Sequence, residues 1–196
     1  MLGSIKHALR NLANPNGRDS RATFWYWVLL IFIFRFLAGM MISVPMSMKM
    51  MAAAVGTVRD GAPASDEAVL KAMMDIVTNE LPTMVWMGIG LGVLTMLLMA
   101  ASLIRRLHDS DLPGWLVLIP GAIYGFALAR APQQIAVATE LLKSMKPGVP
   151  PDMAAMMQQQ GMMVYLGWIP ALMILFIGLR KSTEGPNRYG DAPVTS

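Results

Sequence analysis

The sequence predicts an all-α polytopic membrane protein with four transmembrane helices, on three observations. Four apolar stretches, residues 24–44, 83–104, 114–129 and 162–179, contain a single charged residue, Arg35. The chain is 55% hydrophobic and only 14% charged, whereas ordinary soluble domains are about 25% charged. A helix needs about 20 apolar residues to cross a bilayer, because the hydrocarbon is about 30 Å thick and each residue rises about 1.5 Å.

These crossings divide the chain into an arm (1–23), a four-helix transmembrane domain (24–179) and a tail (180–196). The arm is polar and contains Pro15-Asn16-Gly17, so it lacks the apolar core of a cleaved signal peptide. The first crossing is therefore expected to stay as an anchor. The third stretch is the shortest, and its helix either ends near residue 129 or continues past Arg130.

Basic residues predict the orientation. If both ends lie on one side, the segments on that side (1–23, 105–113 and 180–196) hold nine basic residues in 49 positions. The segments on the other side (45–82 and 130–161) hold six in 70. Because cytoplasmic loops carry the excess of Lys and Arg, both termini are predicted to be cytoplasmic.

The two external loops, 45–82 and 130–161, are predicted to contain short amphipathic helices at the outer surface. Residues 64–81 place apolar side chains at helical spacing between acids, and Met153, Met156 and Met157 repeat this spacing after Pro150-Pro151. Such helices lie in the plane of the membrane interface.

Tryptophans and glycines predict how the crossings are anchored and packed. The five tryptophans (Trp25, Trp27, Trp86, Trp115 and Trp168) fall toward the ends of crossings, where amphipathic rings anchor helices at the interface. Gly88 and Gly92, and Gly121 and Gly125, stand four apart, so each pair is expected to let another backbone approach closely.

Three polar segments distant in sequence share the predicted cytoplasmic face: residues 17–25 (GRDSRATFW), 105–115 (RRLHDSDLPGW) and 185–193 (GPNRYGDAP). On a helix, Asp109 stands at i+4 from Arg105 and i+3 from Arg106, so its carboxylate can pair with either guanidinium. We therefore predict a polar cap on this face. The polar cap comprises Arg18, Arg21, Arg105, Arg106, His108, Asp109, Asn187 and Tyr189.

In these segments the chain resembles the bacterial inner-membrane proteins of the domain of unknown function 805 family. The resemblance is carried by Gly17-Arg18-x-x-Arg21 with the aromatics Phe24 and Trp25, and by residues 105–109 with Trp115. In the tail it is carried by Gly185, Asn187, Arg188, Tyr189, Gly190 and Pro193. It implies a small bacterial inner-membrane protein without an established activity. The long, Met-rich outer loops and Asp191-Ala192 depart from the family pattern.

The favoured function is a structural or regulatory interaction through the polar cap. Its arginines would pair with Asp109 and with lipid phosphate, because a guanidinium matches both bidentately. The expected partners are membrane lipid and either a second copy or another membrane protein. The alternative is that these arginines only follow the charge bias that sets orientation.

A second hypothesis is transport or sensing of a small solute or anion through Arg35. This guanidinium stands about 16 Å into the first crossing by helical rise, where a charge costs roughly 2.5–3.5 kcal/mol. Since no crossing contains an acid, carbonyls, water, a ligand or hydroxyls such as Thr95 and Ser102 must serve it. Alternatively, a shifted or tilted helix lets Arg35 snorkel to the interface.

A minor alternative is Cu(I) binding, because thioethers are soft ligands. Methionines gather at the outer end of the first crossing and in the second outer loop; they are Met40, Met41, Met46, Met48, Met50, Met51, Met153, Met156, Met157, Met162 and Met163. Methionine is also a flexible apolar filler, and the chain has 20.

Catalysis has no motif to support it. With no cysteine and only two histidines, His7 and His108, we predict no catalytic residue, metal site or cofactor, and no enzyme. The basic residues crowd the membrane ends, where topology explains them, so no nucleic-acid partner is predicted either.

Overall fold

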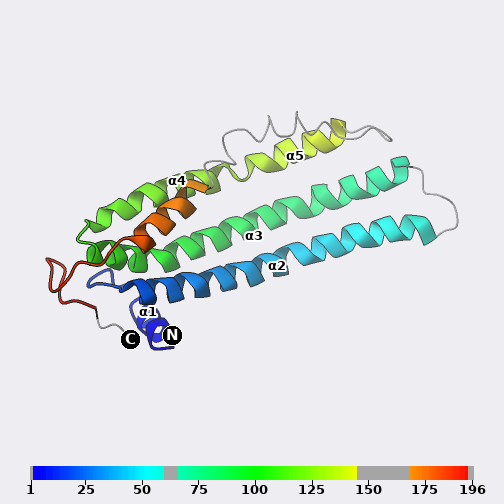
Figure 1. The fold of residues 1–196 in the computed structure, drawn as a ribbon. Helices are drawn as coiled ribbons and strands as arrows, with labels where there is room; N and C mark the ends of the chain where they lie inside the picture. Colours follow the sequence, from blue (N-terminus) through cyan, green and yellow to red (C-terminus); the bar gives the residue numbers. More distant parts are fainter. Residues whose placement is uncertain (1, 60–65, 145–167, 194–196) are drawn as a thin grey trace. The chain divides into compact units, whose positions relative to one another are not determined.

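A computed structural model describes residues 2–59, 66–144 and 168–193 of the chain, and these residues are mainly helical (Figure 1). The helical elements are α1 (Leu2–Arg10), α2 (Arg21–Arg59), α3 (Asp66–Asp109), the 3₁₀ turn η1 (Gly114–Val117), α4 (Leu118–Arg130), α5 (Gln133–Ser144) and a further helix, Trp168–Leu179.

Within the described residues, three helical spans are long and apolar enough to cross a membrane: Arg21–Ala53, Glu67–Asp109 and Gly114–Val137. The helix Trp168–Leu179 is apolar but shorter, and residues 162–167 of the predicted fourth crossing lie outside the described residues. The predicted all-α polytopic membrane fold is confirmed.

The segment predicted as the first outer loop is mostly helical. Helix α2 continues past residue 44 to Arg59, and α3 already begins at Asp66, so the helix expected over 64–81 is continuous with the second crossing. Pro45 and Pro82 lie inside these helices, where a membrane protein can satisfy the freed backbone groups by other contacts. The helix predicted near residues 150–161 lies outside the described residues.

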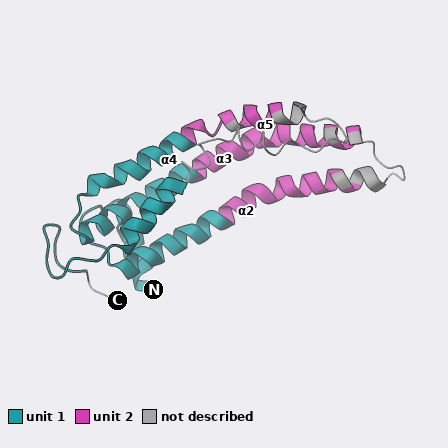
Figure 2. Ribbon diagram, turned by 45° about the horizontal axis from the view of Figure 1, so that its top comes forward, with its two compact units in different colours: residues 1–36, 92–127, 162–196 teal, residues 37–91, 128–161 magenta. Residues whose placement is uncertain are grey.

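The chain forms two compact units (Figure 2). Unit 1 comprises residues 1–36, 92–127 and 162–196, and unit 2 comprises residues 37–91 and 128–161. In unit 2 the Lys49 ammonium lies 2.5 Å from a Glu80 carboxylate oxygen and joins α2 to α3. Both side chains are partly exposed, so this ion pair contributes little to stability.

The apolar core of unit 1 places α2 against α3. Phe24, Trp27 and Ile31 are buried with Met99 and Leu103, because spacings of three and four residues put them on one face of α2. The Trp27 indole N–H donates to the Leu98 carbonyl at 3.1 Å. The prediction that Trp27 is an interfacial anchor is therefore wrong, whereas Trp86, Trp115 and Trp168 are exposed.

At Gly88, Gly121 and Gly125 the predicted close approach of backbones is not found. Within the described part of the chain, a Cβ added at Gly88, Gly121 or Gly125 would meet no atom within 4 Å. A close contact is found at Gly178, whose added Cβ would lie 2.6 Å from the Trp25 ring and 2.8 Å from the Phe24 ring. Here a glycine lets the helix Trp168–Leu179 pack directly on two aromatic rings of α2.

Candidate functional site

The three polar segments meet in unit 1, as the polar cap requires. Five charged side chains from these segments are buried: Arg18, Asp19, Arg105, Arg106 and Asp109. Buried charges are costly unless they are paired and hydrogen-bonded. They are held in two networks, one around each carboxylate.

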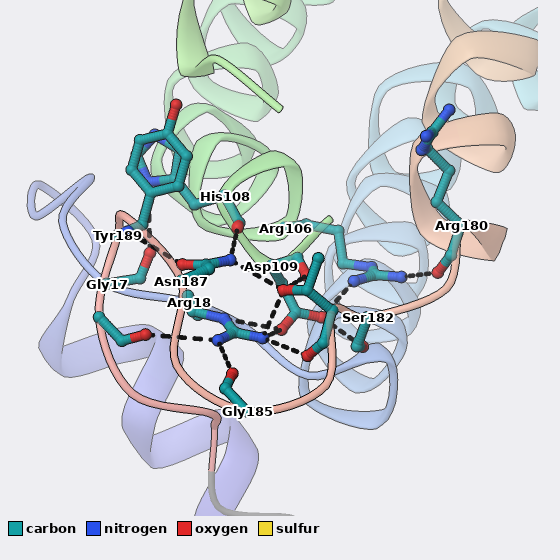
Figure 3. Close-up of polar contacts among 12 residues, drawn as sticks. Gly17, Arg18, Arg106, His108, Asp109, Arg180, Ser182, Gly185, Asn187 and Tyr189 are labelled. Carbon is teal, nitrogen blue, oxygen red and sulfur yellow. Dashed lines mark hydrogen bonds and ion pairs between the residues drawn. The ribbon is translucent and has the colours of Figure 1, made fainter. Parts of the chain in front are cut away.

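We call the contacts around the first carboxylate the Asp109 network; it joins the arm, the end of α3 and the tail (Figure 3). One oxygen, Oδ1, accepts from Arg18 Nε at 3.2 Å and Nη2 at 3.0 Å. The other, Oδ2, accepts from Arg106 Nη1 at 2.5 Å and from the Ser182 hydroxyl. The Asp109 backbone carbonyl also accepts from the Thr183 amide at 2.8 Å. A single residue therefore ties together three segments of the chain.

Arg106 also closes the C-terminal end of the helix Trp168–Leu179. Its Nη2 donates to the Arg180 carbonyl (Figure 3). It also donates to the Gly178 carbonyl at 3.4 Å. The last carbonyls of a helix have no partner within the helix and carry partial negative charge. The Asp109 network holds two guanidinium groups but only one carboxylate. The partial negative charge of these carbonyls therefore offsets the positive charge of Arg106.

Arg18 is enclosed by carbonyls of the tail. It donates to Gly185 O at 2.7 Å, Thr183 O at 2.8 Å and Gly190 O at 3.3 Å. Gly185 and Gly190 have φ angles of 71° and 126°, and residues other than glycine rarely adopt such positive φ angles. The glycines of the tail thus allow the chain to wrap around the guanidinium.

His108, Asn187 and Tyr189 complete the same surface. The His108 and Tyr189 rings are stacked, with centroids 3.8 Å apart and planes at 5°, and Asn187 Nδ2 donates to the His108 carbonyl at 2.9 Å. The Asn187 side-chain oxygen accepts from the Tyr189 amide at 2.9 Å, so it also shapes the turn of the tail. His108 Nδ1 lies 3.3 Å from Gly17 O in the arm (Figure 3).

The second carboxylate forms what we call the Asp19 network. Asp19 Oδ1 accepts from Arg105 Nε at 3.0 Å and lies 3.3 Å from His7 Nε2. Its Oδ2 accepts from the Ser102 hydroxyl at 3.1 Å. Arg105 Nη1 also donates to the Asn11 carbonyl at 2.7 Å. This network fixes α1 and the arm to α3.

Of the predicted polar cap residues, the Asp109 network and its surface contain Arg18, Arg106, His108, Asp109, Asn187 and Tyr189. Arg105 pairs with Asp19 and not with Asp109. The next residue, Arg106, pairs with Asp109, and successive residues of a helix point about 100° apart, so Arg105 points elsewhere. Arg21 is exposed at the first residue of α2, outside both networks. Sequence reasoning missed Asp19, although it lies between the two arginines of the arm motif.

The described hydrogen bonds of the buried arginines all go to oxygens of the protein itself, whereas Arg106 Nε has no hydrogen-bond partner among the described residues. Arg18 and Arg105 have side chains only 1% and 2% exposed, so in this arrangement they contact carboxylates and carbonyls and not lipid phosphate. The two networks can therefore hold distant segments of the chain together.

Arg35 lies in α2, and its Nη1 donates to the Thr95 hydroxyl at 3.4 Å. Thr95 is one of the two hydroxyls considered for Arg35, and the other, Ser102, is bonded to Asp19. Of the methionines considered for Cu(I), Met40, Met41, Met48 and Met51 are exposed on α2. The second group, residues 153–163, lies outside the described residues, so copper binding stays a prediction.

The comparisons with known proteins give one family. The family model described as "Protein of unknown function (DUF805)" matches residues 12–191. Neither a curated protein nor a solved structure matches the chain. The matched range contains every residue of the predicted polar cap.

Proposed function

Since this chain belongs to the DUF805 family of proteins of unknown function, we propose that it is a bacterial inner-membrane protein that acts by binding and not by catalysis. Its role is structural or regulatory interaction, and the polar cap builds the surface that a partner contacts. The observation that carries this proposal is Asp109, a buried carboxylate bonded to the arm, α3 and the tail. A surface assembled from three segments keeps one shape, and this lowers the ordering cost of binding.

Both termini are proposed to be cytoplasmic. The contacts of Arg18 with Asp109 and Thr183 bring the arm and the tail to one end of unit 1. The basic residues are denser in these segments than in residues 45–82 and 130–161, which favours the cytoplasmic side for them.

The proposed partner is anionic membrane lipid, which contacts α1 and not the buried arginines of the polar cap; a second copy or another membrane protein is the further candidate. Lys6 and Arg10 on α1 are exposed beside Leu2 and Leu9, which are 79% and 51% exposed. A short helix with exposed basic and apolar side chains lies at the headgroup boundary of an anionic membrane. Each basic residue near such a surface contributes about 1 kcal/mol.

The test is native mass spectrometry of gently solubilised protein, which reports retained lipid and the number of copies together. We expect the wild type to retain anionic phospholipid, and Lys6→Gln with Arg10→Gln to weaken retention roughly thirtyfold, because two contributions of about 1 kcal/mol are lost. Lys71→Gln, an exposed lysine of unit 2, is the matched control and is expected to retain lipid normally. A wild-type monomer without lipid or partner contradicts the proposal.

A further inference from the structure

Unit 1 contains a cavity of about 670 Å³ between α2, α3, α4 and the helix Trp168–Leu179. This volume is in the range of about 300–1,000 Å³ that is typical of small-molecule sites. Apart from Arg35, Thr95 and Tyr124, the side chains that line it are apolar or aromatic. The polar cap does not contribute to the lining, so this site is separate from the proposed interaction surface.

The polar atoms of the cavity gather at one end. On α2 the lining residues run from Trp25 through Val28 and Ile31 to Arg35, a length of about 15 Å by helical rise. Arg35 is the lining residue of α2 furthest from the polar cap, Thr95 is the furthest on α3, and Tyr124 is the furthest on α4. The cavity is therefore an apolar slot with a guanidinium and two hydroxyl groups at the end furthest from the polar cap.

Arg35 retains donors for a ligand. A guanidinium has five N–H donors, and the hydrogen bond described for Arg35 is a long one, 3.4 Å to Thr95. Arg35 is also the single charged residue of the four predicted crossings. A charged residue at membrane depth is costly and normally faces a functional cavity, and an anion placed beside it would offset this cost.

We propose that the cavity binds a long-chain carboxylate, with its head on Arg35 and its single acyl chain in the apolar slot. A carboxylate matches a guanidinium bidentately, and the hydroxyl group of Tyr124 supplies a further donor. A small hydrophilic anion would leave the apolar part of the slot unfilled. A two-chain phospholipid keeps its head at the membrane interface, whereas Arg35 stands 14 residues into α2, about 21 Å along the helix.

The glycines of α4 provide a matched pair of variants. Gly121 lines the cavity and Gly125, one turn later, does not, and a Cβ at either position meets no described atom within 4 Å. Gly121→Leu therefore fills the slot while Gly125→Leu adds the same side chain outside it. Arg35→Gln removes the charge and leaves the slot.

The experiment measures binding of radiolabelled hexadecanoate to the full chain in lipid nanodiscs, against empty nanodiscs. We expect saturable binding of one hexadecanoate per chain. Arg35→Gln should weaken binding at least tenfold because it removes the charge-assisted hydrogen bond to the carboxylate. Gly121→Leu should weaken it at least tenfold because the added side chain fills the space of the acyl chain. Gly125→Leu is expected to bind within about twofold of the wild type. Unlabelled hexadecanol, which has the acyl chain but not the carboxylate, is expected to displace the label at least tenfold more weakly than unlabelled hexadecanoate does. This comparison uses the wild-type protein alone and does not depend on the folding of a variant.

Three results would overturn the proposal. The first is uptake that does not saturate above that of empty nanodiscs. The second is equal competition by hexadecanol and hexadecanoate, which would mean that Arg35 does not recognise the head. The third is displacement of hexadecanoate by inorganic phosphate or by an added two-chain phospholipid, which would assign the site to a small anion or to bulk lipid.

Discussion

Replacement of Asp109 by asparagine is the most informative perturbation of the polar cap. The carboxylate accepts from Arg18 on one oxygen and from Arg106 and Ser182 on the other. Asparagine keeps the shape but has one acceptor oxygen and one NH₂ donor. Whichever way the amide is turned, its NH₂ group faces the donors of one arginine, and the buried guanidinium charges lose their counter-ion.

Removing one partner of a buried ion pair costs about 3–5 kcal/mol. For a chain of 196 residues, each kcal/mol lowers the melting temperature by about 2–4 °C, so Asp109→Asn is expected to lower it by about 6–20 °C. The assay heats the detergent-solubilised protein and measures the fraction that remains monodisperse on gel filtration.

Asp111→Asn is the matched control, two residues away. Asp111 forms an ion pair with Arg188 at 3.1 Å, but both side chains are about half exposed, and such pairs contribute about 0.2–1 kcal/mol. Asn also tolerates the positive φ angle of 54° at this position. A shift below about 4 °C is expected for the control. If the melting temperature of Asp109→Asn equals that of the wild type, or is no lower than that of Asp111→Asn, the buried carboxylate does not stabilise the polar cap.

Three further changes are expected to separate the structural roles of single residues, measured by the same melting assay. Gly178→Ala should cost about 1–3 kcal/mol, because its Cβ would lie 2.6 Å from the Trp25 ring; Gly88→Ala, which has open space, should cost nothing, and equal behaviour would contradict the packing. Ser20→Ala should cost about 0.5–2 kcal/mol, because the Ser20 hydroxyl accepts from the third residue of α2 at 3.2 Å as an N-cap; an unchanged melting temperature would exclude that role. Asp19→Asn should destabilise about as much as Asp109→Asn, since it leaves a buried arginine without its carboxylate; a shift as small as that of an exposed pair would argue against the Asp19 network.

The sequence predicted the transmembrane fold and the meeting of the three polar segments well, because both depend on coarse patterns. Apolar stretches of about 20 residues specify crossings, and an even number of crossings brings the arm and the tail to one face. The ion pair of Arg106 could also be predicted from helical spacing, because Asp109 stands at i+3. These predictions needed no knowledge of tertiary contacts.

The partners of Arg18 and Arg105 could not be derived in this way. Both pairs, Arg18 with Asp109 and Arg105 with Asp19, join residues more than 80 positions apart, and no periodicity relates such distant positions. The extension of α2 through Pro45 was missed because proline is read as a helix end. The cavity was missed because its lining comes from four helices, and spacing along one helix does not show how four helices pack.

The chain is expected to cross the membrane so that the arm and the tail meet on one face through Asp109. The chain contains no cysteine, so single cysteines at Asn16, Ala52 and Asp191, all exposed positions, can be labelled without background. In sealed vesicles of one orientation, a membrane-impermeant maleimide is expected to label Asn16→Cys and Asp191→Cys from the same side and Ala52→Cys from the other. Labelling of Asn16→Cys and Asp191→Cys from opposite sides would show that the arm and the tail do not share a face of the membrane.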